Sequence, residues 1–511
     1  MTGFVFISSN LIFQRFVASR AFEELETRHD LIYVALREAE DVKQVWASIG
    51  LAEAIAGKRL EWVPFYPRRY AKWKHLFTLS CLHHRDRSSS FAIRHEESFH
   101  NRPEAAARLE RLAQPGIYDA YCAATERQLG LHPDILALTL RQRPDFFVLP
   151  TPGLDQMTDD VMQVANALDI PLLLLVAGWD NLSSKGLFHF QPTMMGVWGE
   201  QSKAHAVQVQ GSDPERVFVV GAPHYEHFRV TGEFDRAAQR GQWGVPVEKP
   251  LILFAGTFRL FDETQVLLEL ERAIESGALP DMHLIYRPHP WRTIRADEKS
   301  FYDFQWRHIT MDPAMADSYQ NTKQGHTSDP ANFLYGMDYL RQVYQTVDAV
   351  ICPMSTVLLE SMLFGLPILA VAFGDGKHSW SADKVSQMMH FKELYEIPEV
   401  LVCRERDRFI SDVARLFAQI GDERVSTALR QNATYFVDLD ETVTYGERVA
   451  TLVDKMLATV DHRPSYDSVD RYLLARHRLR HVWQHTVDYP LRRALNLGLR
   501  IPLQLKRRMF G

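Results

Sequence analysis

The strongest constraint on the fold is a repeated alternation of apolar segments of strand length with amphipathic segments of helix length. The apolar segments are "GFVFIS" (3–8), "LIYVAL" (31–36), "DFFVLPTP" (145–152), "IPLLLLVAGW" (170–179), "TMMGVWG" (193–199), "RVFVVGAP" (216–223), "LILFAGT" (251–257), "MHLIYRPHP" (282–290), "AVICPMS" (349–355) and "LPILAVAFGD" (366–375). Strands that are apolar along their whole length are buried on both faces, which is typical of parallel sheets covered by helices on both sides. The sequence therefore predicts an α/β protein.

The alternation occurs twice, on either side of a polar segment rich in Gly and Pro at 231–250, which is typical of a linker. We predict a Rossmann-like N-terminal domain over 1–230 and a Rossmann-like C-terminal domain over 248–415. Helices over 416–460 are expected to pack back on the domains, and 461–511 to form a basic amphipathic tail. We expect two doubly wound parallel sheets whose strands point their carboxyl ends toward one cleft between the domains. Ligands of such sheets bind at the carboxyl ends of the strands, so the loops at this cleft are the ones to examine for a site.

Composition and charge narrow the class of protein. The chain is 46% apolar and 24% charged, as in ordinary globular proteins. Its four cysteines follow no metal or disulfide spacing, which favours a reducing compartment. We expect no signal peptide, and no apolar run approaches the ~20 residues of a membrane span.

The net charge of −6 is unevenly distributed. The segment 471–511 holds ten Lys or Arg and one Asp, a charge of +9, so the preceding 470 residues carry −15. An acidic body argues against nucleic-acid binding, and the basic tail indicates an anionic partner of its own. The tail and the basic aromatic segment 62–77 suit an anionic membrane surface. We therefore expect a cytoplasmic protein, peripheral on the inner face of the cytoplasmic membrane. A solvated helical face, a tail folded on the acidic body and ordinary core aromatics are the alternatives.

Polar residues follow three predicted strands of the second half. In "AGTFR" (255–259) a glycine allows close approach to the backbone, and a hydroxyl and a cation follow it. In "RPHPW" (287–291) two prolines stiffen a turn that holds an arginine and a histidine. In "CPMSTVLLES" (352–361) hydroxyls begin a helix, where an anion is favoured, and an acid follows one turn later. Together they predict a nucleotide site made of Gly256, Thr257, Arg259, Arg287, His289, Ser355, Thr356 and Glu360. Taken singly, each is equally explained as a helix cap or a turn residue.

The densest polar loop is "AGWDNLSSKG" (177–186), which follows an apolar strand of the first half. Asp180 is a candidate general base, which requires a carboxylate within about 3 Å of the acceptor hydroxyl. Alternatively it forms an Asx turn and Lys185 neutralises a diphosphate. The other predicted residues of this loop are Trp179, Asn181 and Ser183. Rival bases are Asp155, Glu96, Glu97 and His29, and the first strand ends in an ordinary turn or a site at Ser8, Ser9 and Asn10.

Residues 145–415 resemble the GT-B glycosyltransferase superfamily. The nearest-looking members are bacterial surface-polysaccharide transferases and glycerophosphotransferases of the CDP-glycerol type. "RPHP" is similar to the His-Pro element of sialyltransferase-like enzymes, and "MSTVLLESMLFGLPIL" to their Ser-Ser/Thr element. The resemblance implies that His289, Ser355 and Thr356 contact the phosphates of a CMP-, CDP- or UDP-linked donor and that Glu360 contacts its ribose. It implies transfer of a sugar or a glycerol phosphate to a surface polysaccharide or a lipid-linked glycan.

No cofactor is expected, and metal independence is favoured because no DxD-type pair ends a predicted strand. The Asp pair at 159–160 lies early in a helix, where acids are common. Asp180 and His289 are the catalytic candidates. Without a metal ion, the negative charge on the leaving phosphate would be stabilised by His, Arg and Lys side chains and by helix dipoles. Two other functions stay open, namely a sugar-nucleotide epimerase of the UDP-N-acetylglucosamine 2-epimerase type and an inactive GT-B scaffold.

Overall fold

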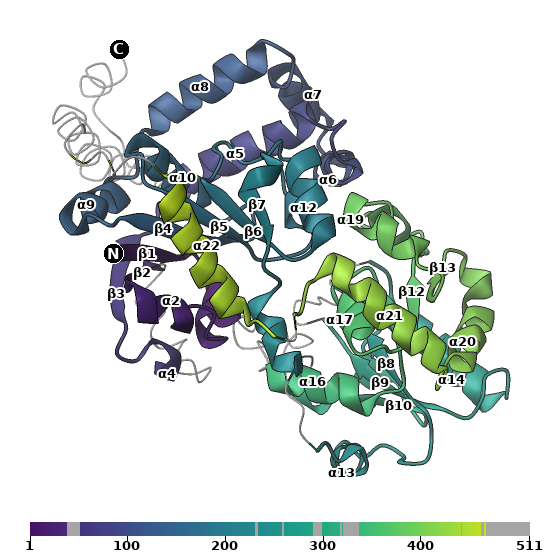
Figure 1. The fold of residues 1–511 in the computed structure, drawn as a ribbon. Helices are drawn as coiled ribbons and strands as arrows, with labels where there is room; N and C mark the ends of the chain where they lie inside the picture. Colours follow the sequence, from purple (N-terminus) through teal and green to yellow (C-terminus); the bar gives the residue numbers. More distant parts are fainter. Residues whose placement is uncertain are drawn as a thin grey trace, which may run out of the picture.

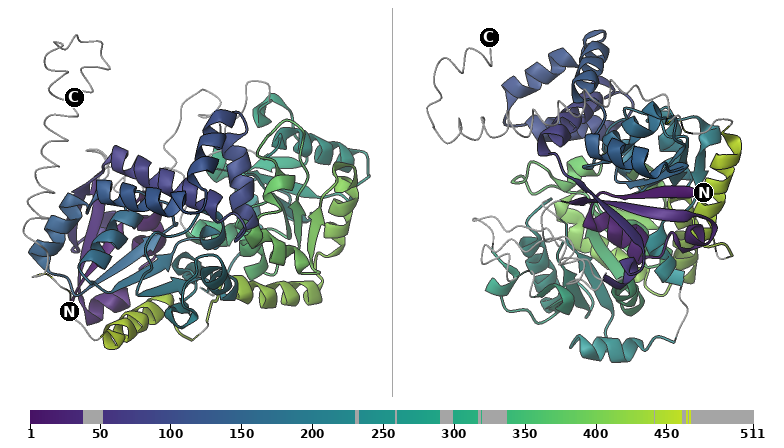
Figure 2. Two further views of the ribbon diagram at one scale, coloured as in Figure 1. Left: turned by 90° about the horizontal axis from the view of Figure 1, so that it is seen from above. Right: turned by 90° about the vertical axis from the view of Figure 1, so that its left-hand side faces the viewer.

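The computed structural model describes residues 1–37, 52–229, 233–257, 260–289, 299–316, 319, 337–440, 442–460, 464 and 466. Arg259 and nearly all of the predicted 461–511 tail lie outside these ranges. Two parallel sheets, each covered by helices on both sides, form two lobes (Figures 1 and 2). No helix of the described ranges is long and apolar enough to cross a membrane.

The N-terminal sheet has seven parallel strands in the order β3-β2-β1-β4-β5-β6-β7. They are β1 (Thr2–Ile7), β2 (Asp30–Arg37), β3 (Arg59–Pro64), β4 (Phe146–Thr151), β5 (Leu172–Val176), β6 (Met194–Val197) and β7 (Val217–Val219). Successive residues of β1 belong to different cores: Phe4 and Phe6 pack on one face of the sheet, Val5 and Ile7 on the other. Both faces are therefore buried, which is why these strands are apolar throughout.

The C-terminal sheet has six parallel strands in the order β10-β9-β8-β11-β12-β13. They are β8 (Leu251–Ala255), β9 (His283–Arg287), β10 (Ile309–Met311), β11 (Ala349–Pro353), β12 (Ile368–Val371) and β13 (Val400–Cys403). In each sheet the strand order reverses once, between β1 and β4 and between β8 and β11. These are the topological switch points at which doubly wound sheets bind ligands. The predicted α/β class with two doubly wound sheets, the arrangement that the GT-B resemblance implies, is confirmed.

Helices connect the strands and add a layer to the N-terminal domain. Those of the first half are α1 (Asn10–Ile12), the π-helix η1 (Phe13–Ala18), α2 (Glu23–Arg28), α4 (Ala52–Ile55), α5 (Pro67–His83), α6 (Ser89–Phe99), α7 (Pro103–Leu112), α8 (Ile117–Leu129), α9 (Pro133–Gln142), α10 (Thr158–Ala167), α11 (Asn181–Ser184), α12 (Glu200–Gln208), η2 (Pro214–Arg216) and η3 (Pro223–Arg229). Those of the second half are α13 (Arg236–Gln242), α14 (Glu263–Glu275), η4 (Phe301–Asp303), α16 (Met337–Thr346), α17 (Val357–Leu363), α18 (Ala382–Val385), α19 (Met389–Lys392), η6 (Glu393–Glu396), η7 (Arg406–Arg408), α20 (Phe409–Ala418), α21 (Glu423–Phe436) and α22 (Tyr445–Thr459).

Three strands that the sequence analysis did not identify are β3, β10 and β13. They lie at the edges of their sheets. β10 has three residues and β13 four, most of them buried, so these two strands are too short for a pattern to stand out. In β3, with sequence "RLEWVP", only Val63 is buried. Edge strands carry little of the signal that made the central strands recognisable.

The chain crosses back from the C-terminal to the N-terminal domain between α21 and α22 (Figure 1). Helix α21 packs against α17, and α22 packs against α2. The Asp438 amide donates to the Trp198 carbonyl at 2.8 Å. A Cβ at Gly221, where φ is +84°, would lie 2.3 Å from the Asp438 carbonyl oxygen. Glycine at this position therefore permits the close approach of the crossing segment to the N-terminal domain.

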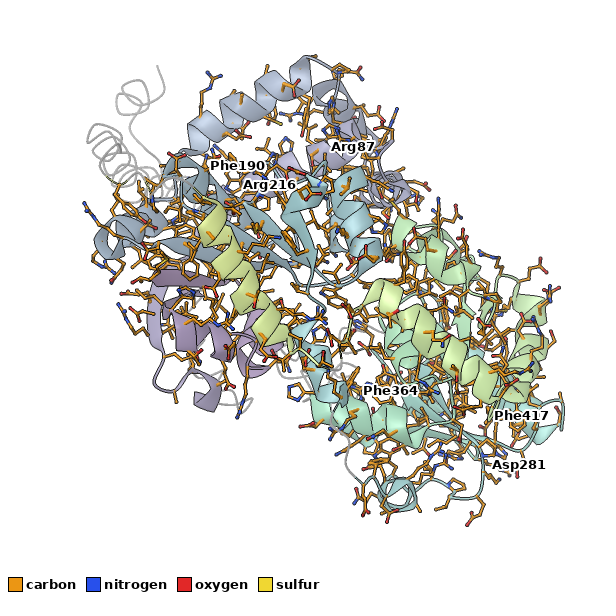
Figure 3. The ribbon with its side chains drawn as sticks, in the orientation of Figure 1. Arg87, Phe190, Arg216, Asp281, Phe364 and Phe417 are labelled. Atoms are coloured by element: carbon orange, nitrogen blue, oxygen red, sulfur yellow. The ribbon has the colours of Figure 1, made fainter. Side chains whose placement is uncertain are left out.

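Aromatic side chains fill the contact between the domains. Trp179, from the loop after β5, meets the rings of His390, Phe391 and Phe436 at 5.2, 5.4 and 5.9 Å between centroids. Near the linker, the ring of Phe364, which is labelled in Figure 3, lies 5.0 Å from the ring of Phe228, measured between the ring centroids. Trp179 is 2% exposed, so this member of the predicted site lies in the packed contact between the domains.

Candidate functional site

The switch point of the C-terminal sheet lies between β8 and β11, and predicted site residues follow both strands. Gly256 and Thr257 follow β8, while Ser355 and Thr356 follow β11. A Cβ at Gly256 would lie 2.4 Å from Oε2 of Glu263, a wholly buried carboxylate. Glu263 accepts the Thr257 amide hydrogen at 2.7 Å. The glycine is therefore required for this close packing of the loop on the first turn of α14.

The Thr257 hydroxyl is 4% exposed and has no hydrogen-bond partner within the part of the chain that the structure describes. A buried hydroxyl without a partner is unfavourable, and native proteins keep few of them. Ser355 and Thr356 are half-buried, and Ser355 Oγ accepts the Val357 amide hydrogen at 3.3 Å. Thr257 thus offers an unused hydrogen-bonding group beside the switch point.

Arg287 and His289 end β9, next to β8. The Arg287 guanidinium donates to Asp312 and lies 5.6 Å from the centre of the Tyr339 ring. Burial lowers the pKa of Arg287, but the charge and hydrogen bond of Asp312, together with Tyr339 and Tyr344, outweigh burial and the pKa is raised overall. His289 is half-buried at the same edge. The structure thus pairs Arg287 inside the C-terminal domain and holds His289 just beyond the strand.

Glu360, the predicted ribose contact, receives two tyrosine hydroxyls. Tyr225 Oη donates to Oε1 at 3.0 Å, and Tyr344 Oη donates to Oε2. Tyr225 belongs to η3 at the end of the N-terminal domain, whereas Tyr344 belongs to α16. Burial, followed by the charge of Glu360, raises the pKa of both tyrosines well above the usual range. Both are neutral donors, and the carboxylate joins the two domains.

Asp180, the predicted base, is surrounded by donors and cations. Its carboxylate accepts from Ser184 Oγ at 2.7 Å and from Asn181 Nδ2 at 3.0 Å, and Lys185 Nζ lies 3.6 Å away. Burial raises its pKa, but Lys185, His390 and other groups outweigh burial and lower the pKa overall. The carboxylate therefore has little affinity for a proton.

The rest of that loop is tightly held. The Ser183 hydroxyl donates to the Asp180 carbonyl at 3.4 Å, and its own carbonyl accepts the Ser88 hydroxyl at 2.5 Å. The Asn181 side chain folds against Gly178, and its Oδ1 is buried without a partner. The loop is therefore held by side-chain hydrogen bonds to Asp180 and by Ser88, but the alternative of an Asx turn is wrong, because the Asp180 carboxylate accepts no amide hydrogen of α11 and Asn181 Oδ1 has no partner among the described residues.

The rival bases are each engaged. Asp155 caps α10 by accepting the Thr158 amide hydrogen at 2.7 Å. Glu96 and Glu97 of α6 reach the C-terminal domain, where they contact Lys384 at 2.9 Å and Ser379 at 2.5 Å. His29 contacts Asp454 of α22 at 3.0 Å, away from the switch points.

The loop after β1 has one unsatisfied group. Ser9 caps α1 by accepting the Ile12 amide hydrogen at 3.3 Å, and Asn10 begins that helix. Ser8 is buried and its hydroxyl has no partner in the described ranges. This hydroxyl lies at the switch point of the first sheet.

An Asp-His pair that the sequence analysis did not identify lies in the loop after β12. His378 Nδ1 is 2.7 Å from Asp375 Oδ2, which also accepts the Asp262 amide hydrogen at 3.0 Å. Burial raises the pKa of Asp375, but amide donors and His378 outweigh it and lower the pKa to about 2. The ionised carboxylate fixes the imidazole with Nδ1 as donor, which leaves Nε2 as the basic nitrogen. The polar loop "FGDGKHSW" is visible in the sequence, but its pairing is not.

Several solved structures are similar to this chain. They include S. aureus MnaA with UDP (10% identity, TM-score 0.47, covering 91% of this chain and 99% of that one) and UDP-N-acetylglucosamine 2-epimerase from Rickettsia bellii (10%, 0.48, 90% and 97%). A third is the calicheamicin glycosyltransferase CalG4 (12%, 0.43, 90% and 99%). No protein-family model and no curated protein matches the chain. Likenesses at this level are too low for a function to be inferred from them.

No three His, Cys, Asp or Glu side chains within the described ranges come together to hold a metal ion. Metal independence stays a prediction.

Proposed function

We propose that the protein is an enzyme that binds a nucleotide-activated sugar, or a nucleotide-activated glycerol phosphate, between its two domains and transfers that group to a hydroxyl of a glycan acceptor. One observation carries the proposal: Gly256, Thr257, Ser355 and Thr356 follow β8 and β11, the two strands that flank the switch point of the second sheet. Ligands of doubly wound sheets bind there.

Each predicted residue has a role that its chemistry suits. The Thr257 hydroxyl and the hydroxyls of Ser355 and Thr356 donate to the donor's phosphates, and His289 stabilises the charge on the leaving phosphate. Glu360 accepts hydrogen bonds from the ribose diol. It already receives two hydroxyls, so a ribose would take the place of one or both tyrosines.

His378 is the general base that the geometry favours over Asp180. A base must gain a proton, and the pKa of Asp180 is lowered by Lys185 and His390 despite burial. His378 is oriented by an ionised carboxylate at the same strand-end edge as Thr257. In the reaction, Nε2 takes the acceptor hydroxyl proton as the oxygen forms its bond to the transferred group and the nucleotide phosphate leaves. His378→Gln should abolish turnover and leave donor binding intact.

Epimerisation of a nucleotide sugar is the second candidate. In its favour, α6 is joined to residues 379–389 by Glu96–Lys384, Glu97–Ser379, Ser89–Gln387 and Ser90–Met389 contacts. This closes one side between the domains, which suits a single small substrate better than a polymer. An acidic membrane surface as partner, and a location on the inner face of the cytoplasmic membrane, stay predictions because the basic tail lies outside the described residues.

The test is thermal stability of the purified protein with CMP-, CDP- and UDP-linked sugars and CDP-glycerol. One donor class should raise Tm, since a ligand that binds only the folded state stabilises it. Ser355→Ala should reduce the shift in Tm. Ser276→Ala should not, because Ser276 lies at the C-terminal end of α14, the end away from the switch point. Product analysis then separates transfer from epimerisation. The absence of a shift with every nucleotide would favour the inactive scaffold.

A further inference from the structure

Arg94 of α6 is a half-buried arginine with unused hydrogen-bond donors. Its guanidinium makes no hydrogen bond or ion pair with any described residue, and Nε is buried without a partner. It lies over the ring of Trp380, with the guanidinium carbon 5.9 Å from the ring centre. Arginine has five donors and keeps its charge when buried, so such an unpaired position is unfavourable unless a ligand supplies the acceptors.

A second cation lies beside it. The pKa of Lys185 is raised by Asp180, but burial and the like charge of Arg94 outweigh this and lower it overall. Asp180 is the carboxylate that both cations share, and it already accepts from Ser184 and Asn181. The Asp180 oxygens are thus already engaged by neutral donors, and Arg94 keeps donors that no described residue accepts.

Two buried uncharged groups complete the cluster. His390 of α19 is 3% exposed and Asn181 of α11 is 6% exposed, and neither His390 Nδ1 nor Asn181 Oδ1 has a partner in the described part of the chain. Burial lowers the pKa of His390 to about 3, so the imidazole is neutral near pH 7. Helix α11 packs against both α6 and α19. A ligand here meets donors and an acceptor as well as the two cations.

We propose that Arg94 and Lys185, with His390 and Asn181, bind a monoanionic group of the acceptor: the carboxylate of an acidic sugar or a phosphodiester. The assignment to the acceptor rests on the proposed function. The donor contacts follow β8 and β11 of the C-terminal domain, whereas this cluster is built by α6 and the loop after β5, with α19 closing it. Glu97 lies one turn from Arg94 on α6 and bonds Ser379, so two carboxylates, Asp180 and Glu97, stand beside the two cations, which suits a single negative charge better than a donor diphosphate.

The test is calorimetric titration of the full-length protein with D-glucuronate, with dimethyl phosphate and with neutral D-glucose. The wild type should bind one of the two anions, and the tighter one identifies the source of the charge. Arg94→Gln and Lys185→Gln should each weaken binding by about 10- to 100-fold, as for loss of a charge-assisted hydrogen bond. Arg102→Gln, at the exposed residue before α7, and Lys74→Gln, on the exposed surface of α5, are the controls and should bind as the wild type does.

The same variants are assayed for the Tm shift given by nucleotide donors. Arg94→Gln should keep the full donor shift and a folded circular dichroism spectrum, and Arg94→Lys should keep part of the anion binding. Equal binding of glucose, or anion binding unchanged in both glutamine variants, would overturn the proposal. Loss of the donor shift in them would assign the cations to the donor and overturn the acceptor assignment. If the wild type binds an anion but no nucleotide, the proposed function fails while the site stands.

Discussion

Two carboxylates at the contact between the domains are held in opposite ways. Glu360 of the C-terminal domain receives two neutral tyrosine hydroxyls, whereas Asp180 of the N-terminal domain lies beside Lys185 among buried polar groups. Neutral hydroxyls exchange readily with those of a ligand, because each contributes only about 1 kcal/mol net. A carboxylate that balances cations cannot be removed without leaving them unpaired. The C-terminal edge is therefore suited to exchange ligands, and the N-terminal edge to stay fixed.

Among the substitutions that compare the two edges, the largest effect should come from His289, on the exchanging side. His289→Ala should lower turnover, or slow donor hydrolysis, by about 100- to 1000-fold, which corresponds to ~2.7–4 kcal/mol of charge stabilisation. Unfolding free energy should change little. His100→Ala, at an exposed position, is the control and should leave the rate unchanged. A loss of stability without a loss of rate would assign His289 a structural role and weaken the contrast between the two edges.

Asp180→Asn should act on stability instead. It leaves Lys185 and Arg94 without a shared counter-charge, which should lower the free energy of unfolding by ~2–3 kcal/mol, after allowing for the 25% and 30% exposure of the Asp180 and Lys185 side chains. The folded-state pKa of Asp180 is lowered, so its contribution is present above the unfolded pKa of ~3.9 and is lost as pH falls below it.

Urea denaturation at pH 7 measures this change. Asp454→Asn, which breaks an exposed pair with Arg28, is the matched control and should lower the free energy of unfolding by at most ~1 kcal/mol. If the two substitutions lowered the free energy of unfolding equally, the pair of Asp180 with Lys185 would contribute no more than a surface ion pair does.

The fixed edge should also be sensitive to pH. His205 of α12 is 1% exposed, neither ring nitrogen has a partner in the described ranges, and burial lowers its pKa to about 4. The unfolded state, with a pKa of ~6.5, takes up the proton first, so stability falls as pH drops from ~6.5 toward the folded pKa. Between pH 7 and 5 this amounts to ~2 kcal/mol for one histidine.

His205→Gln should therefore reduce the loss of unfolding free energy between pH 7 and pH 5, while His100→Gln should not. Denaturation curves at the two pH values decide the question. An unchanged pH dependence in His205→Gln would show that the imidazole is hydrated or protonated in the folded protein.

The sequence predicts the loops that carry the two carboxylates and their neighbours, but it does not predict the partners that hold them. The strand-end loops of Thr257, Ser355 and Asp180 are visible because continuous apolar strands end abruptly in polar residues. The partners of these loops come from distant segments: Tyr225 lies 135 positions from Glu360, and Arg94 comes from a helical insertion without a recognisable motif. Domain packing brings them together, and a local pattern carries no record of it. Of the groups that lower the pKa of Asp180, Lys185 lies in "WDNLSSK" itself, whereas His390 and Arg94 come from distant segments and could not be read from that loop.

The smallest effect should come from Tyr225, which joins Glu360 to the N-terminal domain. Tyr225→Phe removes one hydroxyl that a ribose must replace, so nucleotide binding should tighten by about two- to tenfold, the equivalent of one net hydrogen bond. The free energy of unfolding should fall by ~1 kcal/mol for the same reason. Tyr33→Phe is the matched control, because its hydroxyl also donates to a carboxylate, Glu26, at 2.5 Å but far from either switch point. It should reduce stability and leave nucleotide affinity unchanged. Weaker nucleotide binding in Tyr225→Phe would mean that the tyrosine contacts the ligand and does not compete with it, and Glu360 would then belong to the fixed side of the comparison.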